Sequence, residues 1–176
     1  MREWFFLRTT PDAIIRSRLS KGDEERLTVG RNVSNDPVET KVARLRYAAG
    51  EAFVAESQSG HAIVTSFGHE ATAPTPMELL LIALGGCTGA DVISILEKKR
   101  QRVTGYEIEV RAERRAEHPR IYTQIEVVHR VRGHNIDPKA VAHAVELSET
   151  KYCSVSAMLG ASAEIVMRYE IEQEVL

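Results

Sequence analysis

Alternating hydrophobic and polar positions predict six β-strands, of which the first three are short. Residues 42–48, 52–57 and 61–67 form three such runs, separated by Gly50 and by Ser59 and Gly60. Glycine and serine at these breaks favour tight turns, so the three runs predict a meander of strands.

Three longer strands are predicted in the second half of the chain. In residues 106–114 the side chains of Tyr106, Ile108 and Val110 share one face, while charged residues occupy the other. Residues 121–131 and 163–172 repeat this alternation. A period of two with one charged face is typical of an antiparallel sheet with one wet side. We therefore expect the six strands to form a sheet with one dry face.

A long helix is predicted over residues 73–100. Pro74 and Pro76 suit its beginning and Glu78 its first turn, while the basic residues 98–100 suit its end. The intervening segment LLLIALGGCTGADVISIL is apolar nearly all round. A helix with such a surface is expected to be buried on all sides.

Two further helices are predicted before the last strand. Asp137 and Pro138 are typical of a helix start, and this helix is expected to reach about residue 149. A short helical piece carries Cys153 and ends at Gly160. The order strand–strand–strand–helix–strand–strand–helix–helix–strand predicts an α+β fold.

Composition and charge narrow the class of protein. The chain of 176 residues is 43% hydrophobic and 27% charged, as in ordinary globular proteins, with a formal net charge of −2. Such a chain lacks the basic excess of a nucleic-acid-binding protein. The longest charge-free stretch, residues 79–90, is too short to cross a membrane. No signal peptide is recognised, so a cytoplasmic location is expected.

The first forty residues differ from the rest in their pattern of apolar and charged residues. Trp4, Phe5 and Phe6 form an apolar head, followed by a polar, charge-mixed stretch without a sustained period. We interpret residues 1–40 as an N-terminal arm and residues 41–176 as the folded domain. The apolar head is expected to dock on its own domain or on a partner subunit, with a disordered tail as the alternative.

The two cysteines are the main candidates for chemistry. Cys87 lies mid-helix in the sequence GGCTG, and Cys153 lies on the second helical piece, between Tyr152 and Ser154. Either is a core residue or a reactive thiol, and small glycines around Cys87 leave room for close packing or a substrate. Neither has a CxxC or Cys/His spacing, and GGCTG lacks the frame of a phosphate loop. We therefore expect no metal site and no cofactor, and interpret the six histidines as scattered surface or strand residues.

A reactive Cys87 would need help from its surroundings. A thiol with an ordinary pKa of about 8.5 is only a few per cent ionised at pH 7. Burial raises the pKa, and Asp91, one turn further along the same helix face, raises it too when ionised. A nearby cation is required, and the spacing of the residues does not identify it.

Two segments carry a resemblance to a known family. PTPMELLLIALGGCTGADVISILEKKRQ at 74–101 and KYCSVSAML at 151–159, with the strands between them, resemble the OsmC/Ohr family of osmotically induced and organic-hydroperoxide-resistance proteins. The resemblance covers about residues 42–172 and is greatest to the YhfA-like branch.

The resemblance implies an intertwined homodimer in which sheets of both subunits wrap long central helices. It also implies a thiol-dependent hydroperoxide reductase in oxidative-stress defence. Cys87 would be the peroxidatic thiolate and Cys153 the resolving cysteine, with a dithiol reductant closing the cycle.

Two departures from the family pattern lead to an alternative. The peroxidases carry a glutamate where this chain has Met77, and Glu78 falls nearly opposite Cys87 on an ideal helix. The loop after the first strand lacks the family's arginine, so Arg46, Arg44 or an arginine of the arm is the candidate replacement. The alternative function is a non-enzymatic dimer that binds a small apolar ligand or senses redox state.

The long helix also predicts a dimer by itself. One sheet and one further helix cannot cover an apolar helix on every side. Leu80, Leu84 and Ile95 are expected to face water on a monomer, a patch that favours twofold association. We expect an obligate homodimer whose monomer is not stably folded.

Overall fold

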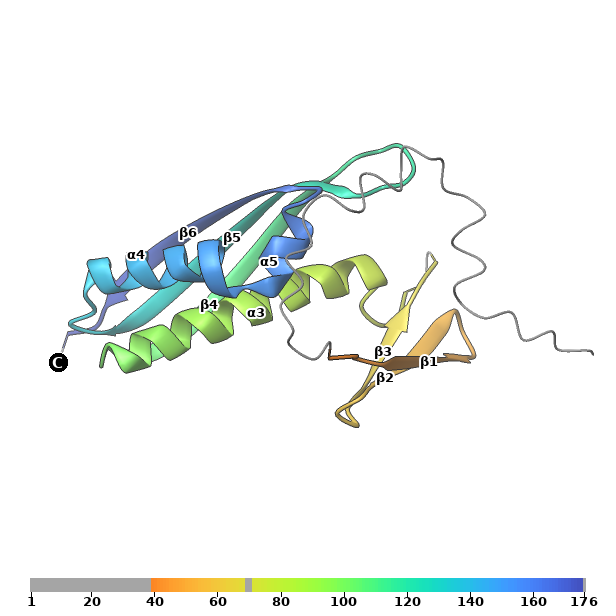
Figure 1. The fold of residues 1–176 in the computed structure, drawn as a ribbon, viewed down its shortest axis with the longest axis horizontal. Coiled ribbons are helices and arrows are strands. Elements are labelled where there is room, and N and C mark those ends of the chain that lie inside the picture. Colours follow the sequence, from red (N-terminus) through yellow and green to blue (C-terminus); the bar gives the residue numbers. More distant parts are fainter. Residues whose placement is uncertain (1–38, 69–70, 176) are drawn as a thin grey trace, which may run out of the picture. The chain divides into compact units, whose positions relative to one another are not determined.

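The computed structural model describes residues 39–68 and 71–175, and has the predicted order of elements. The expected N-terminal arm therefore lies almost wholly outside the described residues. The elements are β1 (Ala43–Ala48), β2 (Ala52–Ser57), β3 (Ala62–Ser66), α3 (Pro76–Lys98), β4 (Arg102–Arg114), β5 (Tyr122–His134), α4 (Pro138–Leu147), η1 (Ser148–Tyr152), α5 (Ser154–Leu159) and β6 (Glu164–Gln173). The expected α+β class is confirmed (Figure 1).

The strands in residues 39–68 and 71–175 form two sheets, so the expectation that they form one sheet is wrong. β1, β2 and β3 make an antiparallel meander, as predicted, and β4, β5 and β6 make the second sheet. β5 pairs with β4 in antiparallel and with β6 in parallel orientation. An exclusively antiparallel sheet was therefore also a wrong expectation. Parallel neighbours need a crossover connection, which α4, η1 and α5 provide here.

The beginning of α3 is fixed by a capping box at Thr75. The Thr75 hydroxyl accepts a hydrogen bond from Glu78 N at 3.3 Å, and Glu78 Oε2 accepts one from Thr75 N at 2.7 Å. These bonds satisfy backbone donors that the first turn leaves free. The hydrogen bonds that the Glu78 carboxylate accepts from Thr75 N and the Thr75 hydroxyl hold its pKa below its usual range. The Asp137 cap of α4 is likewise confirmed, with its side chain accepting from Lys139 N.

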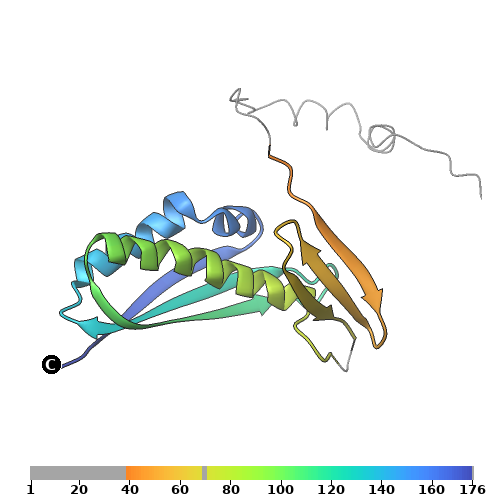
Figure 2. The same ribbon diagram turned by 90° about the horizontal axis from the view of Figure 1, so that it is seen from below.

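One side of α3 packs on the second sheet and on the helices that follow. α3 and α4 lie side by side on one face of β4–β5–β6 (Figure 2). Val92 and Leu96 are fully buried there, as is Leu84 beside β5. The expectation that Leu84 faces water is therefore wrong, and Ile95 is partly buried against the same core.

The opposite side of α3 is exposed, so the described residues of one chain do not bury the helix on all sides. Leu80 is 38% exposed and Ile82 is 59% exposed. Ala83, Gly86 and Ala90 continue this face toward the C-terminal end of the helix. We call these five residues the outer face of α3. Leu81, Ile82, Gly85 and Gly86 also line an open apolar hollow of about 520 Å³ between α3 and β4.

Gly85 and Gly89 allow β4 to approach the backbone of α3. A Cβ atom at Gly85 would lie 3.2 Å from Val110 Cγ2, and one at Gly89 would overlap Ile108 Cδ1. These glycines therefore serve helix–sheet packing, which offsets the roughly 1 kcal/mol each costs inside a helix. Of the two uses expected for the glycines around Cys87, close packing is therefore the one that the structure shows at these two positions.

Gly89→Ala is expected to lower the free energy of unfolding by up to about 2 kcal/mol, because the added methyl meets Ile108 and this overpacking exceeds the roughly 1 kcal/mol of helix propensity that alanine regains. Ile108→Val removes the obstructing methyl and by itself costs about 1 kcal/mol. The double variant should then be more stable than the sum of the two losses predicts. Denaturant unfolding at fixed protein concentration gives the free energy of unfolding of the wild type, both single variants and the double variant. If the two losses simply add in the double variant, the proposed contact between Gly89 and Ile108 is contradicted.

By length and composition α3 is long enough to cross a membrane, with a mean hydropathy of 2.0 over 18 residues. The charge-free stretch of residues 79–90 is shorter than this helix, because α3 continues past Asp91 to Lys98. The side of α3 that packs on β4, α4 and α5 is, however, part of the protein core. We interpret α3 as a core helix with one uncovered side.

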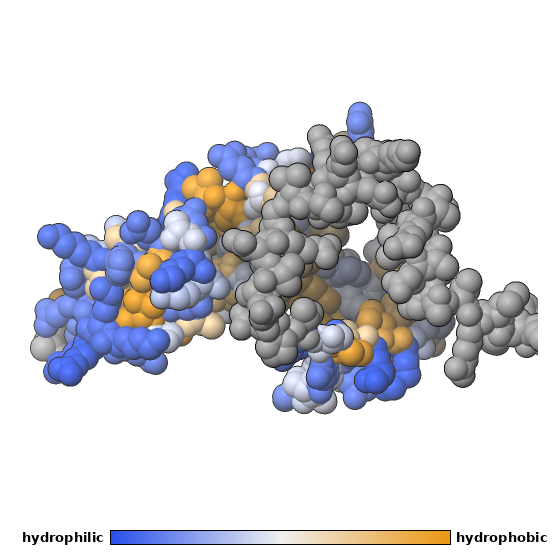
Figure 3. All heavy atoms as spheres, viewed as in Figure 1, coloured by the Kyte–Doolittle hydropathy of each residue, from blue (hydrophilic) through white to orange (hydrophobic). Residues whose placement is uncertain are grey.

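The β1–β3 sheet has an apolar face that is open to solvent. The register places Leu45 opposite Ala55, Tyr47 opposite Phe53, and Ala55 opposite Ile63. Leu45, Tyr47 and Ile63 are each more than half exposed. Figure 3 shows hydrophobic residues at the molecular surface among hydrophilic ones. We call Leu45, Tyr47, Phe53, Ala55 and Ile63 the open face of the first sheet.

Candidate functional site

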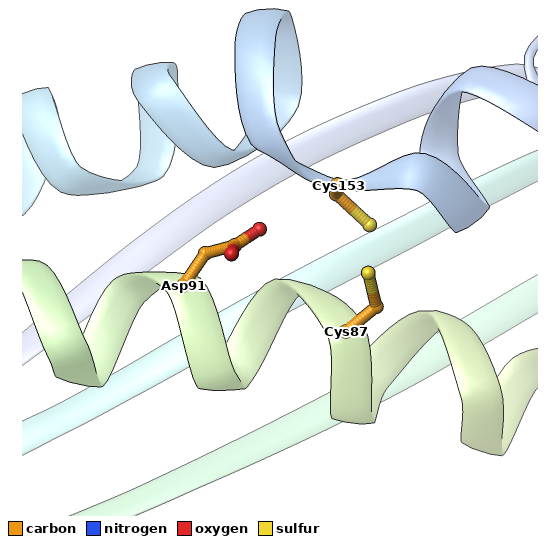
Figure 4. Close-up of side chains that lie close together, drawn as sticks. All are labelled: Cys87, Asp91 and Cys153. Atoms are coloured by element: carbon orange, nitrogen blue, oxygen red, sulfur yellow. The ribbon is translucent and has the colours of Figure 1, made fainter. Parts of the chain in front are cut away.

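Cys87 and Cys153 come together from two different helical elements. Cys87 lies midway along α3 and is half-buried, whereas Cys153 is the N-cap residue of α5 and is only 4% exposed. The Cys153 sulfur accepts a hydrogen bond from Ser156 N at 3.3 Å. Figure 4 shows the two sulfurs facing each other, and both are free thiols. The structure thus places the two predicted site cysteines within reach of each other.

Asp91 lies beside the two sulfurs, on the same side of α3 as Cys87. One donor atom from each of Cys87, Asp91 and Cys153 lies within 4.8 Å of the other two (Figure 4). Asp91 Oδ2 accepts a hydrogen bond from the Ser148 hydroxyl at 3.0 Å. Ser148 is fully buried, so its hydroxyl holds the carboxylate in place next to the thiols.

Ser148 and Cys153 are connected through η1, a single turn of π-helix. Cys153 N donates to the carbonyl oxygen of Ser148 at 3.0 Å, which closes this wide turn. π-turns are rare and occur frequently at functional sites. Here the turn places Cys153 and Ser148 on the same side of the α4–α5 segment, toward α3. The predicted helix to residue 149 therefore ends earlier, at Leu147.

The surroundings of Cys87 raise the pKa of its thiol. Burial is the largest cause, and the hydrogen bond and charge of Cys153 and the charge of Asp91 act in the same direction. A hydrogen bond with the backbone of Val155 opposes them. Among the residues that the structure describes in one chain, no cation lowers this pKa. The reactive form of Cys87 is thus a minority species at neutral pH.

The other two supporting candidates lie elsewhere in the described chain. The Glu78 carboxylate caps α3 through Thr75. Arg46 lies on β1 with its side chain 71% exposed, and its Nη2 is 3.6 Å from Glu56 Oε2. The structure therefore does not bring Glu78 or Arg46 to Cys87 within one chain, and a role for Arg46 stays a prediction.

Tyr106 and His129 form a hydrogen-bonded pair in the core near Asp91. His129 lies on β5, as expected for a strand histidine, and is fully buried. The Tyr106 hydroxyl and His129 Nδ1 are 2.6 Å apart, and the two rings stack. Burial lowers the pKa of His129 to about 4, so the ring is neutral at pH 7. Burial and then the charge of Asp91 raise the pKa of Tyr106. Both side chains are therefore uncharged at pH 7, and the pair packs as a polar part of the core.

Ser148 and the Tyr106–His129 pair are the neighbours of the site that the sequence reasoning missed. No motif signals Ser148, because it approaches Asp91 only through the fold. The contact between Tyr106 and His129 does have a signal in the sequence, because both residues take inward positions on neighbouring strands. The register places Tyr106 opposite Val131 and Ile108 opposite His129. Two polar residues facing the same core were therefore diagonal neighbours.

The two cysteines, one in the long helix and one after the second helix of an α+β domain, define an OsmC-like protein. The family model for OsmC-like proteins matches residues 68–168, and the chain belongs to this family. It is 44% identical to the protein YhfA of Escherichia coli K12 over 129 residues, which is 73% of this chain and 96% of YhfA.

Solved structures share the fold over most of the chain. A protein of Aquifex aeolicus VF5 is 36% identical, with a TM-score of 0.71 covering 78% of this chain and all of that one. An organic hydroperoxide resistance protein, OsmC, from Legionella pneumophila has 11% identity and a TM-score of 0.56, covering 77% and 99% of the two chains. The latter likeness concerns the fold alone.

Proposed function

We propose that this protein is a thiol-dependent reductase of organic hydroperoxides in which Cys87 attacks and Cys153 resolves. The observation that carries the proposal is the position of the two free sulfurs, which face each other from α3 and the start of α5. A family that includes hydroperoxide-resistance proteins supports the choice of substrate class.

The proposed cycle has three steps. The Cys87 thiolate attacks the O–O bond of the hydroperoxide and becomes a sulfenic acid, while an alcohol leaves. The Cys153 thiol condenses with this sulfenic acid, so that a disulfide forms and water leaves. A dithiol reductant then reduces the disulfide by thiol exchange, which requires a reducing compartment such as the cytoplasm.

We also propose that the working form is a homodimer. One chain exposes two apolar surfaces, the outer face of α3 and the open face of the first sheet. Small residues on the outer face, Ala83, Gly86 and Ala90, allow close contact with another backbone. A second copy that covers both surfaces would place Cys87, one residue from Gly86, near the subunit boundary.

The test is a rapid-mixing assay of the reduced protein with cumene hydroperoxide. The wild type should consume one equivalent without reductant and form a Cys87–Cys153 disulfide, detected by mass spectrometry. Cys87→Ser should lose at least about 100-fold in rate, because no other thiol of the chain occupies its position. Cys153→Ser should stop after one turnover with a sulfenic acid that dimedone labels.

Ser154→Ala is the matched control, because it alters an exposed residue next to Cys153 and should leave the assay unchanged. A wild type that reacts no faster than Cys87→Ser would overturn the proposed reductase.

The raised pKa of Cys87 favours a second candidate function, a redox sensor that is oxidised slowly. Such a protein would form the same disulfide, and excess dithiothreitol would reduce it again, so the two functions differ in the rate of oxidation and not in the number of equivalents consumed. Stopped-flow oxidation by cumene hydroperoxide separates them, since the reductase should react at least about 100-fold faster than free cysteine at the same pH and the sensor should not.

A further inference from the structure

The group of Cys87, Asp91 and Cys153 has the properties of a metal site as well as of a thiol pair. Two sulfurs and one carboxylate oxygen lie within 4.8 Å of one another. Cys87 and Asp91 are one helical turn apart on α3, and Cys153 faces them from the start of α5 (Figure 4). The absence of a CxxC or Cys/His spacing could not exclude such a site, because its ligands come from separate elements.

The distances suit a tetrahedral ion. Zinc–sulfur bonds of about 2.3 Å at tetrahedral angles place two sulfurs about 3.8 Å apart. The present separations of at most 4.8 Å therefore require the two sulfurs to approach by about 1 Å at most, and each sulfur and the carboxylate oxygen by about 1.3 Å at most. Two soft sulfurs with one carboxylate favour zinc over magnesium and calcium, which take oxygen ligands.

The residues around the group orient its donors. The buried Ser148 hydroxyl donates to Asp91 Oδ2, and Ser156 N donates to the Cys153 sulfur. Hydrogen bonds of this kind fix the direction of metal ligands and are a regular part of metal sites.

The charge of Asp91 is uncompensated within the part of the chain that the structure describes. No lysine, arginine or histidine there forms an ion pair with this half-buried carboxylate. A carboxylate next to two ionisable thiols is an unfavourable arrangement unless a cation joins it. A bound divalent ion would supply that cation.

We propose that the reduced protein binds one zinc ion through Cys87 Sγ, Cys153 Sγ and the Asp91 carboxylate, with water as the fourth ligand. Binding breaks two S–H bonds, releases two protons and forms three bonds from protein to metal. The bound state and the Cys87–Cys153 disulfide exclude each other, because the disulfide removes two of the three donors.

Oxidation by a hydroperoxide would release the ion. The two sulfurs give two electrons to the O–O bond and two protons come from solvent, so that the products are the disulfide, an alcohol, water and free zinc. This step rests on the proposed function, whereas the binding of zinc stands on the geometry of the group alone.

The experiment is a titration of the reduced, metal-free, full-length protein with zinc in competition with a chromophoric chelator. We expect one ion per chain and a dissociation constant below about 1 μM. Cobalt, used as a second probe, should give the charge-transfer absorption of thiolate ligands. Cumene hydroperoxide added to the zinc-loaded protein should release zinc in proportion to the disulfide formed.

The variants identify the ligands. Cys87→Ser and Cys153→Ser should each weaken zinc binding by more than about 100-fold, and Asp91→Asn by at least about tenfold with the thiolate absorption retained. Ser148 orients Asp91 and is not itself a ligand, so Ser148→Ala should weaken zinc binding by about tenfold. Glu97→Gln, an exposed acid on the same helix, is the matched control and should bind as the wild type.

Circular dichroism of the metal-free variants verifies that each is folded. Substoichiometric binding, or wild-type affinity in both cysteine variants, would overturn the site. Zinc that stays bound after complete disulfide formation would overturn the exclusion of the two states. A failed hydroperoxide assay would remove the proposed reductase and leave the zinc titration as it stands, so the two proposals fail separately.

Discussion

The rate constant for reaction of the reduced protein with cumene hydroperoxide is expected to rise about tenfold per unit between about pH 6.5 and about pH 8.5. Only the thiolate attacks, and its fraction grows tenfold per pH unit while the pH is below the pKa. Burial, Cys153 and Asp91 raise the pKa of Cys87, so this range lies on the rising part of the curve. Stopped-flow measurements across the range, at constant ionic strength, give the slope.

The variant Asp91→Asn tests the cause of this pH dependence. It removes a negative charge that raises the pKa of Cys87, so its reaction should be faster than that of the wild type at pH 7. A rate that is independent of pH over the range would contradict the prediction, since it would mean that the thiolate is already formed. A cation that the described residues of one chain do not supply to Cys87 would then be required, and Arg46→Gln would test one of the candidates named in the sequence.

Ile82→Glu is expected to weaken the homodimer by at least about 100-fold. The side chain is 59% exposed in one chain, so the substitution leaves the protomer core intact. In the proposed dimer it would bury an unpaired carboxylate, which costs about 3 kcal/mol or more. Sedimentation equilibrium over a wide dilution range should show the wild type at twice the chain mass of 19.6 kDa and the variant dissociating.

Met158→Glu is the matched control for the dimer. Met158 is 76% exposed on α5 and belongs to neither apolar surface, so the same chemical change should not affect association. Circular dichroism on the same samples tests the expectation that the monomer is not stably folded. A folded wild-type monomer at low micromolar concentration would show that the outer face of α3 needs no cover.

Local signals in the sequence predicted the elements well because each is determined by neighbouring residues. The start of α3 depends on Thr75, Pro76 and Glu78, which lie within four positions of one another. The alternation in β4 and β5 likewise predicted which side chains face the core, since side chains in a strand alternate between its faces. The pairing of two cysteines was expected from the family resemblance, and the structure shows their sulfurs facing each other.

What the sequence did not reveal depends on contacts between distant segments. The burial of Leu84 follows from the way α3 packs on the second sheet, and an all-round apolar helix does not show which of its sides is covered. The parallel pairing of β6 depends on how α4 and α5 cross over the sheet. The contact of Ser148 with Asp91 joins residues 57 positions apart.

The π-turn at η1 places a constraint on chain length near the site. Its middle residues, Glu149, Thr150 and Lys151, are exposed, so substitutions there meet few contacts. Deleting one of them would change the turn from the i→i+5 hydrogen bond of a π-helix to the i→i+4 bond of an α-helix. The segment that follows would then rotate by about 100° relative to α4. Cys153 would then no longer face α3. Relatives that keep both cysteines should therefore differ in the composition of this turn and agree in its number of residues.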